Sequence, residues 1–363
     1  MKKSRILCAF LAALMALSAS GCGDKESSSE KVKTTTTNSE ALTADVVGTT
    51  AAPEDETAES ETKDDTSKND GTVDINDYIT VDTPAPALWK ASDPETGNEL
   101  YLMGTIHVVS EEKYSLPDYI MEVYDNCDGI AVEVDPNKLS DMSVLQEFLT
   151  YLVYTDGTTI KDHISEESYE IGKECFEDMG MYNELLDVYT PGFWLNQIES
   201  SAMLELKNLS SEGVDSRFAS MAADDGKEIV DIENLEIQAS AMNAYPDDLA
   251  DFCFKSIKEE FDDPSIIAES LGELYNLWAT GKIDEMLEVD ENSDEIPDEL
   301  LDDYNEYMDT MLYNRNIGMA ERAAEFLEDG DNYFFMVGSL HFAGDKGVDD
   351  LLADMGYTVE RVH

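Results

Sequence analysis

The chain has 363 residues, of which 42% are hydrophobic, and its 81 acidic and 23 basic residues give a formal net charge of −58. It is long and apolar enough to bury a core. Its charge argues against nucleic acid and anionic lipid headgroups as partners, because no cluster of Lys and Arg follows the first five residues. Cations, and substrates with neutral or positive groups, are the favoured partners, and most of the carboxylates must lie on solvated faces.

Residues 1–21 have the pattern of a signal peptide. Positive charge in residues 1–5 precedes a 14-residue apolar run (6–19), which is shorter than the ~20 residues of a membrane-spanning helix. The Ala-Ser-Gly-Cys string that ends at Cys22 resembles a bacterial lipobox, which implies cleavage before Cys22 and a diacylglycerol on its thiol. We therefore expect a lipid anchor on the extracytoplasmic face of a bacterial membrane. The alternatives are a secreted protein cut near Ala19 and a retained transmembrane helix.

Residues 22–74 are expected to form a disordered acidic tether. Residues 23–72 carry 13 acidic and 5 basic residues, contain no aromatic residue and are rich in Ser, Thr and Ala. Such a segment cannot bury enough apolar surface to offset the entropy lost on ordering. The folded domain is therefore expected to span residues 75–363.

Three cysteines remain in that domain, Cys127, Cys175 and Cys253. Their odd number and the absence of a C-x-x-C spacing imply no disulfide framework. Each lies among apolar residues, so we expect buried thiols. A Cys175–Cys253 bridge is the alternative, since the expected compartment is oxidising.

The folded part begins with a predicted β-hairpin, in which strands 87–92 and 99–104 flank a Pro- and Gly-containing turn. Apolar residues at helical spacing then predict a helix over 115–127, and a short apolar run predicts a strand over 129–135. Strand, helix and strand at this spacing indicate a βαβ crossover, in which the strand ending at Gly104 pairs in parallel with the strand over 129–135.

Residues 138–225 and 234–328 are helical by pattern, interrupted by a strand-like run at 226–234. The chain then alternates again: a helix over 298–328, a strand over 332–338, a helix over 347–356 and a strand over 357–362. Strands gather near both ends of the domain and helices fill its centre. The predicted fold is therefore α/β, one domain with a mixed sheet and a large helical insertion.

Two of the four histidines share one context. His107 ends the string Gly104-Thr-Ile-His and His341 ends the string Gly338-Ser-Leu-His, each directly after an apolar strand. From the glycine frequency, about 0.2 such G-x-x-H strings are expected by chance. Ligand crevices form at the carboxyl ends of strands in open α/β sheets, so the two imidazoles are expected to converge. The alternative is a pair of packed or capping histidines; His163 and His363 have no comparable setting.

Glu133 is the third candidate, because a carboxylate in an apolar strand is costly to bury unless it is paired or coordinates a cation. If its strand neighbours the one that ends at Gly104, Glu133 and His107 emerge side by side. Two imidazoles and a carboxylate are a ligand set for a divalent first-row metal, with open positions for water and substrate. The alternative is that Glu133 only caps a nearby helix.

The remaining candidates are Asp215, Glu233 and the pair Arg315-Asn316. Arg315 is suited to stabilise an oxyanion or orient a carboxylate, and a surface ion pair is its alternative. The sequence contains no H-E-x-x-H, G-x-S-x-G, G-x-G-x-x-G or P-loop string, which argues against zincins, serine hydrolases, dinucleotide-binding enzymes and NTPases.

Taken in order, these strings resemble the TraB/GumN family, which includes the Tiki proteases and the pheromone-shutdown proteins. The resemblance covers most of residues 85–363 and rests on GTIHV (104–108), AVEVD (131–135), the stretch 213–238, RN (315–316) and the stretch 334–362. The family's two G-x-x-H motifs fall on His107 and His341, its acidic position on Glu133 and its G-x-D on Gly213 and Asp215. The family's Leu-Glu is replaced here by Ile232-Glu233.

The resemblance implies a fold of the erythromycin-esterase and ChaN type and the activity of a metal-dependent hydrolase. Similarity to the Tiki branch implies a peptidase that uses Mn²⁺ or Co²⁺, and Zn²⁺ is a further candidate for the metal. His107, His341 and Glu133 would hold the metal, with Glu133 alternatively the general base and Arg315 beside the oxyanion. The pheromone-shutdown branch supplies the alternative of a surface protein that sequesters a peptide or small molecule, and ChaN the alternative of haem binding.

Overall fold

The computed structural model describes residues 72–291 and 296–363. The predicted signal peptide, the lipidation site Cys22 and nearly all of the predicted tether lie outside these residues. Near the expected start of the folded domain, Asp74 forms a parallel bridge with Lys207. Among the described helices, none is both long and apolar enough to cross a membrane.

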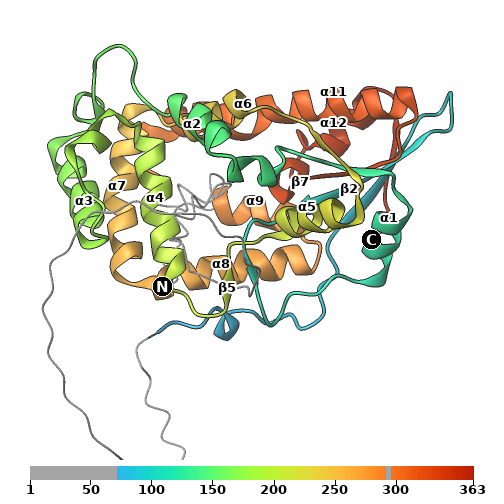
Figure 1. Cartoon of the computed structure of the whole chain (residues 1–363), viewed down its shortest axis with the longest axis horizontal. Coiled ribbons are helices and arrows are strands. Elements are labelled where there is room, and N and C mark those ends of the chain that lie inside the picture. Colours follow the sequence, from blue (N-terminus) through green and yellow to red (C-terminus); the bar gives the residue numbers. More distant parts are fainter. Residues whose placement is uncertain (1–71, 292–295) are drawn as a thin grey trace, which may run out of the picture. The chain divides into compact units, whose positions relative to one another are not determined.

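A six-stranded mixed sheet forms the centre of the α/β part (Figure 1). Its strand order is β6-β4-β7-β2-β1-β8, with parallel pairing from β6 to β2 and antiparallel pairing of β1 with both β2 and β8. The strands are β1 (Leu88–Ser92), β2 (Glu99–Thr105), β4 (Gly129–Val132), β6 (Glu228–Asp231), β7 (Tyr333–Gly338) and β8 (Thr358–Arg361). The predicted mixed sheet, built mostly from strands near both ends of the domain, is confirmed.

The predicted hairpin is confirmed, with Leu88 opposite Met103 and Ser92 opposite Glu99. The predicted pairing of β2 with β4 is wrong, because β7 lies between them and pairs in parallel with both. The reason lies in β7 itself, which is apolar on both faces and therefore most stable at the centre of the sheet. The crossover from β2 to β4 consequently spans one intervening strand.

Helices cover both faces of the sheet. The α-helices in chain order are α1 (Asp118–Asn126), α2 (Met142–Thr150), α3 (Glu166–Asp178), α4 (Pro191–Leu204), α5 (Val214–Asp225), α6 (Leu235–Met242), α7 (Asp247–Asp262), α8 (Pro264–Ala279), α9 (Ile283–Glu291), α10 (Leu301–Met308), α11 (Asn314–Asp329) and α12 (Val348–Asp354). Helix α5 packs on β4 and β6, whereas α11 and α12 pack together and contact β2, β1 and β8.

Successive aromatic residues of β7 show how the two layers are held. The ring of Phe334 meets Phe218 of α5 at a centroid distance of 5.7 Å, and the ring of Phe335 meets Phe326 of α11 at 6.4 Å. Neighbouring side chains of a strand point to opposite faces, so β7 joins both helical layers to one core. Leu102 of β2 and Val337 of β7 are at most 1% exposed, so these strands lie in the core.

In the helical insertion, α3, α4 and α7 pack beside one another, away from the strands (Figure 1).

Two local features differ from the predicted pattern. A two-stranded ribbon pairs β3 (Val109–Ser110) with β5 (Leu209–Ser210), and β5 lies inside the stretch 138–225 that was expected to be helical. The helix expected over 298–328 is divided by a π-helical turn at Asp309–Tyr313, directly before Arg315.

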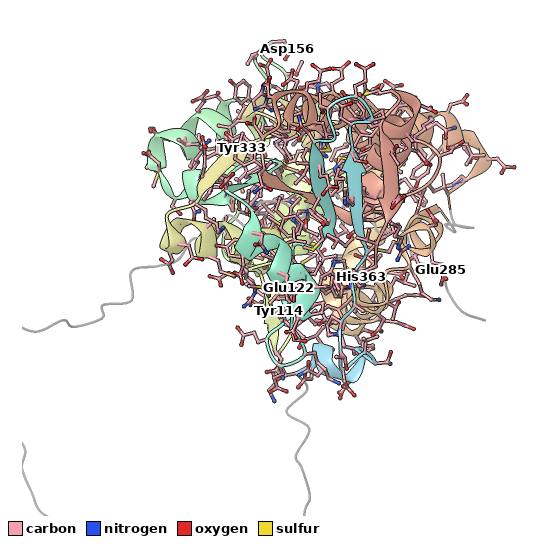
Figure 2. All side chains as sticks on the ribbon, turned by 90° about the vertical axis from the view of Figure 1, so that its right-hand side faces the viewer. Tyr114, Glu122, Asp156, Glu285, Tyr333 and His363 are labelled. Carbon is pink, nitrogen blue, oxygen red and sulfur yellow. The ribbon has the colours of Figure 1, made fainter. Side chains whose placement is uncertain are left out.

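Cys127, Cys175 and Cys253 are buried free thiols, so the Cys175–Cys253 bridge does not form. Many carboxylates lie at the surface, as the net charge requires. Glu122, Asp156 and Glu285 are exposed, and Figure 2 shows Asp156 and Glu285 at the edge of the molecule in that view.

Candidate active site

The two G-x-x-H strings lie side by side, since β2 and β7 are parallel neighbours and Thr105 is paired with Gly338. Their contact is tight: a Cβ atom on Gly104 would lie 2.8 Å from Cα of Ser339. Only glycine allows this approach. Ser339 Oγ donates to the carbonyl oxygen of Thr105 across 2.9 Å, which joins one string to the other.

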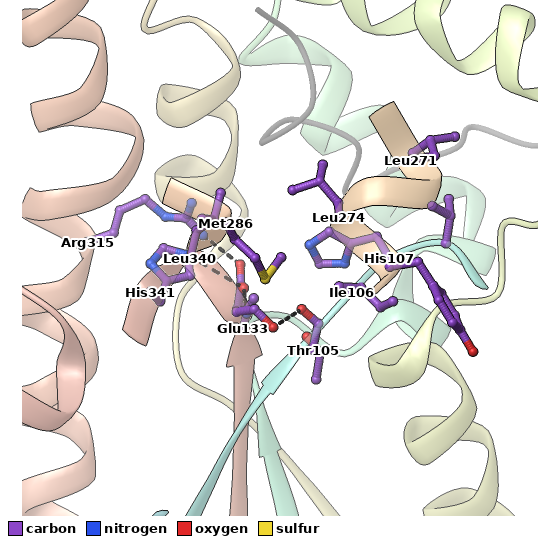
Figure 3. Close-up of a pocket in the computed structure, with 14 residues that line it drawn as sticks. Thr105, Ile106, His107, Glu133, Leu271, Leu274, Met286, Arg315, Leu340 and His341 are labelled. Carbon is purple, nitrogen blue, oxygen red and sulfur yellow. Dashed lines mark hydrogen bonds and ion pairs between the residues drawn. The ribbon is translucent and has the colours of Figure 1, made fainter. Parts of the chain in front are cut away.

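Three predicted residues, His107, Glu133 and His341, lie around Gly338, and Figure 3 shows these three side chains at the strand ends. A Cβ atom built on Gly338 would lie 3.3 Å from Glu133 Oε1, 3.6 Å from His341 Cδ2 and 3.7 Å from His107 Nε2. Each of these residues follows the end of one of the parallel strands β4, β7 and β2, so the strand ends bring them together although β2 and β4 are not neighbours. Glycine at this position keeps the space between them open.

His341 is buried and held in one orientation by Asn316, the first-turn neighbour of Arg315 on α11. Its Nδ1 lies 2.5 Å from Asn316 Oδ1, and the Asn316 amide nitrogen donates to the carbonyl oxygen of Lys346 at 2.8 Å. Because that second bond fixes which amide atom is oxygen, Nδ1 carries the proton and Nε2 keeps its lone pair. Burial, together with the positive charge of Arg315, lowers the pKa of His341 to about 3.

His107 has a different partner. Its Nδ1 lies 3.4 Å from Oδ1 of Asp215, a buried oxygen without a hydrogen bond in the described chain. Gly213 brings Asp215 here, since a Cβ atom on Gly213 would lie 2.5 Å from Cα of His107. Burial by itself would lower the pKa of His107, but Asp215 and then Glu133 outweigh it and raise that pKa above its ordinary value.

Arg315 is 7% exposed and does not form the surface ion pair that was its alternative. Its Nη2 lies 2.6 Å from Glu133 Oε2 and 2.8 Å from Glu233 Oε2, and its Nε lies 2.9 Å from Glu233 Oε1. Its Nη1 donates to the carbonyl oxygen of Met311 at 3.0 Å, within the π-helical turn. Arg315 thus holds two carboxylates and orients Glu133, rather than presenting a free guanidinium to the cavity.

Gln238 completes this network and was not singled out from the sequence. Its amide nitrogen donates to Glu133 Oε2 at 3.0 Å and to Glu233 Oε2 at 2.6 Å. Gln238 lies on α6, five residues after Glu233. This proximity to Glu233 in the sequence was the only sign that Gln238 belongs to the site. Glu133 Oε1 also accepts from the backbone N–H of Gly338 at 2.7 Å, so both oxygens of Glu133 are bonded.

The pKa values of Glu133 and Glu233, the two carboxylates that bind Arg315, are shifted in opposite directions. Burial raises the pKa of Glu233 above its ordinary value, despite Arg315. Burial also opposes ionisation of Glu133, but Arg315, His341 and His107 outweigh it and hold the pKa of Glu133 well below its ordinary value. Glu133 is therefore ionised at neutral pH, and Glu233 is the more easily protonated of the two.

These groups open into a cavity of about 60 Å³, lined on one side by His107, Glu133, Arg315 and His341. The opposite side is apolar and comes from α8, α9 and the residues after β2 and β7. That side is made by Ile106, Val108, Leu271, Leu274, Tyr275, Met286 and Leu340. His163, stacked on Tyr154, and His363, stacked on Tyr119, do not line this cavity.

The donor types fit a divalent first-row cation, but the arrangement does so only in part. His341 presents an unprotonated Nε2, and the Asp215 oxygen 3.4 Å from Nδ1 of His107 is the kind of outer partner that orients a metal-binding imidazole. Glu133, in contrast, already accepts hydrogen bonds from Arg315, Gln238 and the backbone N–H of Gly338. Within residues 72–291 and 296–363, no group of three or more His, Cys, Asp or Glu side chains is arranged to hold a metal ion.

Comparison with known proteins agrees with these motifs. The sequence is similar to Metalloprotease TIKI2 of Danio rerio, with 22% identity over 318 residues that cover 75% of this chain and 60% of the relative. It is also similar to Metalloprotease TIKI1 of Danio rerio, with 23% identity over 304 residues that cover 72% of this chain and 60% of the relative. The chain thus spans about three fifths of the length of these relatives. No solved structure matches it.

The sequence model of the TraB/PrgY/gumN family matches residues 87–361. This range contains the six-stranded sheet, both G-x-x-H strings, Glu133 and the Arg315 network. The chain belongs to the TraB/PrgY/gumN family.

Proposed function

We propose that this protein is a metal-dependent hydrolase that cleaves peptides. The observation that carries the proposal is the convergence of His107, His341 and Glu133 on Gly338, at the carboxyl edge of three parallel strands. The similarity to two proteins named metalloproteases supports it at low identity and over part of their length.

In this proposal, Nε2 of His107 and Nε2 of His341 hold the cation, and Glu133 completes the set when one of its hydrogen bonds is released. A divalent cation there would polarise the scissile carbonyl and lower the pKa of water. Asn316 holds the proton of His341 on Nδ1, and Asp215 orients His107. Arg315 and Gln238 keep Glu133 ionised and aimed at the cavity.

The test is hydrolysis of a quenched-fluorescent peptide library after chelation and after addition of Mn²⁺, Co²⁺ or Zn²⁺. We expect activity to disappear with the chelator and to return with one of the metals, and both His107→Ala and His341→Ala to lose metal retention and activity together. His163→Ala is the matched control, because His163 does not line the cavity. Peptide cleavage that persists in the chelator would refute the metal requirement.

A second candidate function is capture of a peptide or small molecule without turnover. The engagement of Glu133 by Arg315, Gln238 and Gly338 favours it, since the lowered pKa of this carboxylate makes it a weak base. Product fragments formed at substoichiometric protein concentration separate the two candidates, because a binding protein releases none. The haem-binding alternative is favoured by no feature of the described residues.

We also propose that the domain is tethered by a lipid on Cys22 to the extracytoplasmic face of a bacterial membrane. The charged start, the apolar run and the lipobox-like string of residues 1–22 support this location. Radioactive palmitate should label the wild-type chain, and Cys22→Ala should lose the label and leave the membrane fraction. A Cys22→Ala chain that stays labelled would exclude this anchor.

A further inference from the structure

The apolar side of the cavity is a continuous wall of side chains from α8 and α9. Leu271, Leu274 and Tyr275 lie three and four residues apart on α8, so one face of that helix is directed at the polar cluster. Met286 of α9 closes the wall between them and His341, as Figure 3 shows. Leu271 and Met286 are each 3% exposed and Leu274 is 6% exposed, so this wall is screened from bulk water.

This wall offers no partner to a charged side chain. The hydroxyl of Tyr275 donates to the carbonyl oxygen of Lys113 at 3.0 Å, so its ring is what remains for the cavity. Arg315, the one cationic side chain among the described lining residues apart from the imidazoles, already holds two carboxylates. A carboxylate or ammonium group placed against Leu271 and Leu274 would be buried unpaired, which is strongly unfavourable.

The size of the space limits its occupant further. A cavity of about 60 Å³ is small for a peptide side chain, and the methionine in its wall has three rotatable bonds with which to adapt. A medium-sized aliphatic group can enter by turning the Met286 side chain. An indole or phenol ring fits less readily, because it is larger and rigid.

We infer that Leu271, Leu274 and Met286 form a subsite for an aliphatic side chain of the substrate, Leu, Met, Ile or Val, next to the bond held at the His107–Glu133–His341 cluster. The inference rests on the proposed hydrolase function and deepens it by naming the substrate class: neutral peptides with an aliphatic residue flanking the scissile bond. Acidic and basic residues are excluded from that position.

The experiment uses blocked, quenched peptides that differ at one position, scanned on both sides of the cleaved bond, with Leu, Met, Ala, Phe, Asp or Lys there. With metal-loaded wild-type protein, kcat/KM for Leu or Met should exceed that for Asp or Lys by about 100-fold. Met286→Ala should raise the ratio of Phe to Leu cleavage by about 10-fold, because truncation enlarges the subsite. Met142→Ala, at a methionine that is 65% exposed on α2, should leave the profile unchanged.

If Met286→Ala is too unstable to assay, Met286→Leu, which keeps the side-chain volume, replaces it and should retain the preference for Leu over Asp.

A second readout does not need turnover. It is calorimetric binding of blocked peptides whose central amide is reduced and therefore uncleavable. Aliphatic-selective binding without any cleavage would support the subsite and refute the hydrolase. Cleavage that is equal for Leu, Asp and Lys, or a profile that Met286→Ala does not change, would overturn the subsite and leave the hydrolase standing. Neither cleavage nor selective binding would refute both.

Discussion

His341 Nδ1 lies 2.5 Å from the side-chain oxygen of Asn316, and this contact decides which imidazole nitrogen faces the cavity. Asn316→Leu removes the acceptor, so the ring can rotate and change tautomer. We expect metal affinity and kcat/KM to fall by about 10- to 100-fold, the effect typical of losing an outer partner of a metal-binding histidine. Asn314→Leu, an exposed position on the same helix, is the control. Equal metal affinity in both variants would show that Asn316 does not orient His341.

Arg315 balances two buried carboxylates, so the two sides of this network should respond unequally to mutation. Arg315→Met leaves Glu133 and Glu233 buried without a cation, and we expect the free energy of unfolding to fall by about 3–5 kcal/mol. Glu133→Gln should lower it by less, about 1–3 kcal/mol, because Glu233 still pairs with Nε and Nη2 of Arg315 while the new amide nitrogen faces a donor that Glu133 accepted from.

Urea denaturation measures these differences. Arg322→Met, on the solvent side of the same helix, breaks an ion pair with Glu325 and should lower the free energy of unfolding by less than about 1 kcal/mol. The geometry gives Glu233 two nitrogens of Arg315 and Glu133 one. An equal loss in Glu133→Gln and Arg315→Met would contradict this unequal pairing.

The hydroxyls of the two G-x-x-H strings should contribute differently to stability. Ser339 Oγ donates to Thr105 O, whereas Thr105 Oγ1 is buried and has no partner in the described chain. Ser339→Ala should therefore lower the free energy of unfolding by about 1–2 kcal/mol, and Thr105→Val should leave it unchanged or raise it slightly. Melting temperatures of the two variants decide this, and a clear loss in Thr105→Val would reveal an ordered water bound to that hydroxyl.

Asp349, in the first turn of α12, should make stability depend on pH. Burial, then the neighbouring charges Asp350 and Asp284, raise the pKa of Asp349 to about 6. A raised pKa means that the folded state prefers the protonated form, so stability falls as pH rises from the unfolded pKa, near 4, through 6.

Asp349→Asn should consequently be more stable than the parent at pH 8, by at most about 3 kcal/mol, and the gain should shrink as pH falls toward 4. Asp354→Asn, at the exposed end of the same helix, should show no such pH-dependent gain. Denaturant titrations at several pH values provide the comparison; a gain independent of pH would contradict titration of Asp349.

The individual elements of the sheet could be predicted because each is encoded locally. Alternating and continuous apolar runs mark the hairpin and the strands β4, β6, β7 and β8, and they place Leu102 and Phe335 in the core. The neighbour of each strand is not encoded in this way. β2, β4 and β7 are all apolar, so the sequence favoured the nearest pairing, and the insertion of β7 between the other two depends on packing against both α5 and α11.

Some residues of the candidate site could likewise be predicted from the sequence and others could not. His107, His341 and Glu133 could be found because each directly follows an apolar strand, and parallel strands end at one edge. The burial of Arg315 could not, because an arginine in a helical stretch with many carboxylates before and after it is ordinarily found in a surface ion pair. The π-helical turn before it has no sequence signature. Gln238 looks like an ordinary helical glutamine until α6 is placed against Glu133.

The central position of β7 determines when the cluster can exist during synthesis. His341 leaves the ribosome 234 residues after His107, and β7, which lies between β2 and β4 in the folded sheet, is synthesised after both. Until then, β2 and β4 lack their shared neighbour and the growing chain carries a single G-x-x-H string. Any reactivity that requires both imidazoles is therefore absent from every chain that ends before His341.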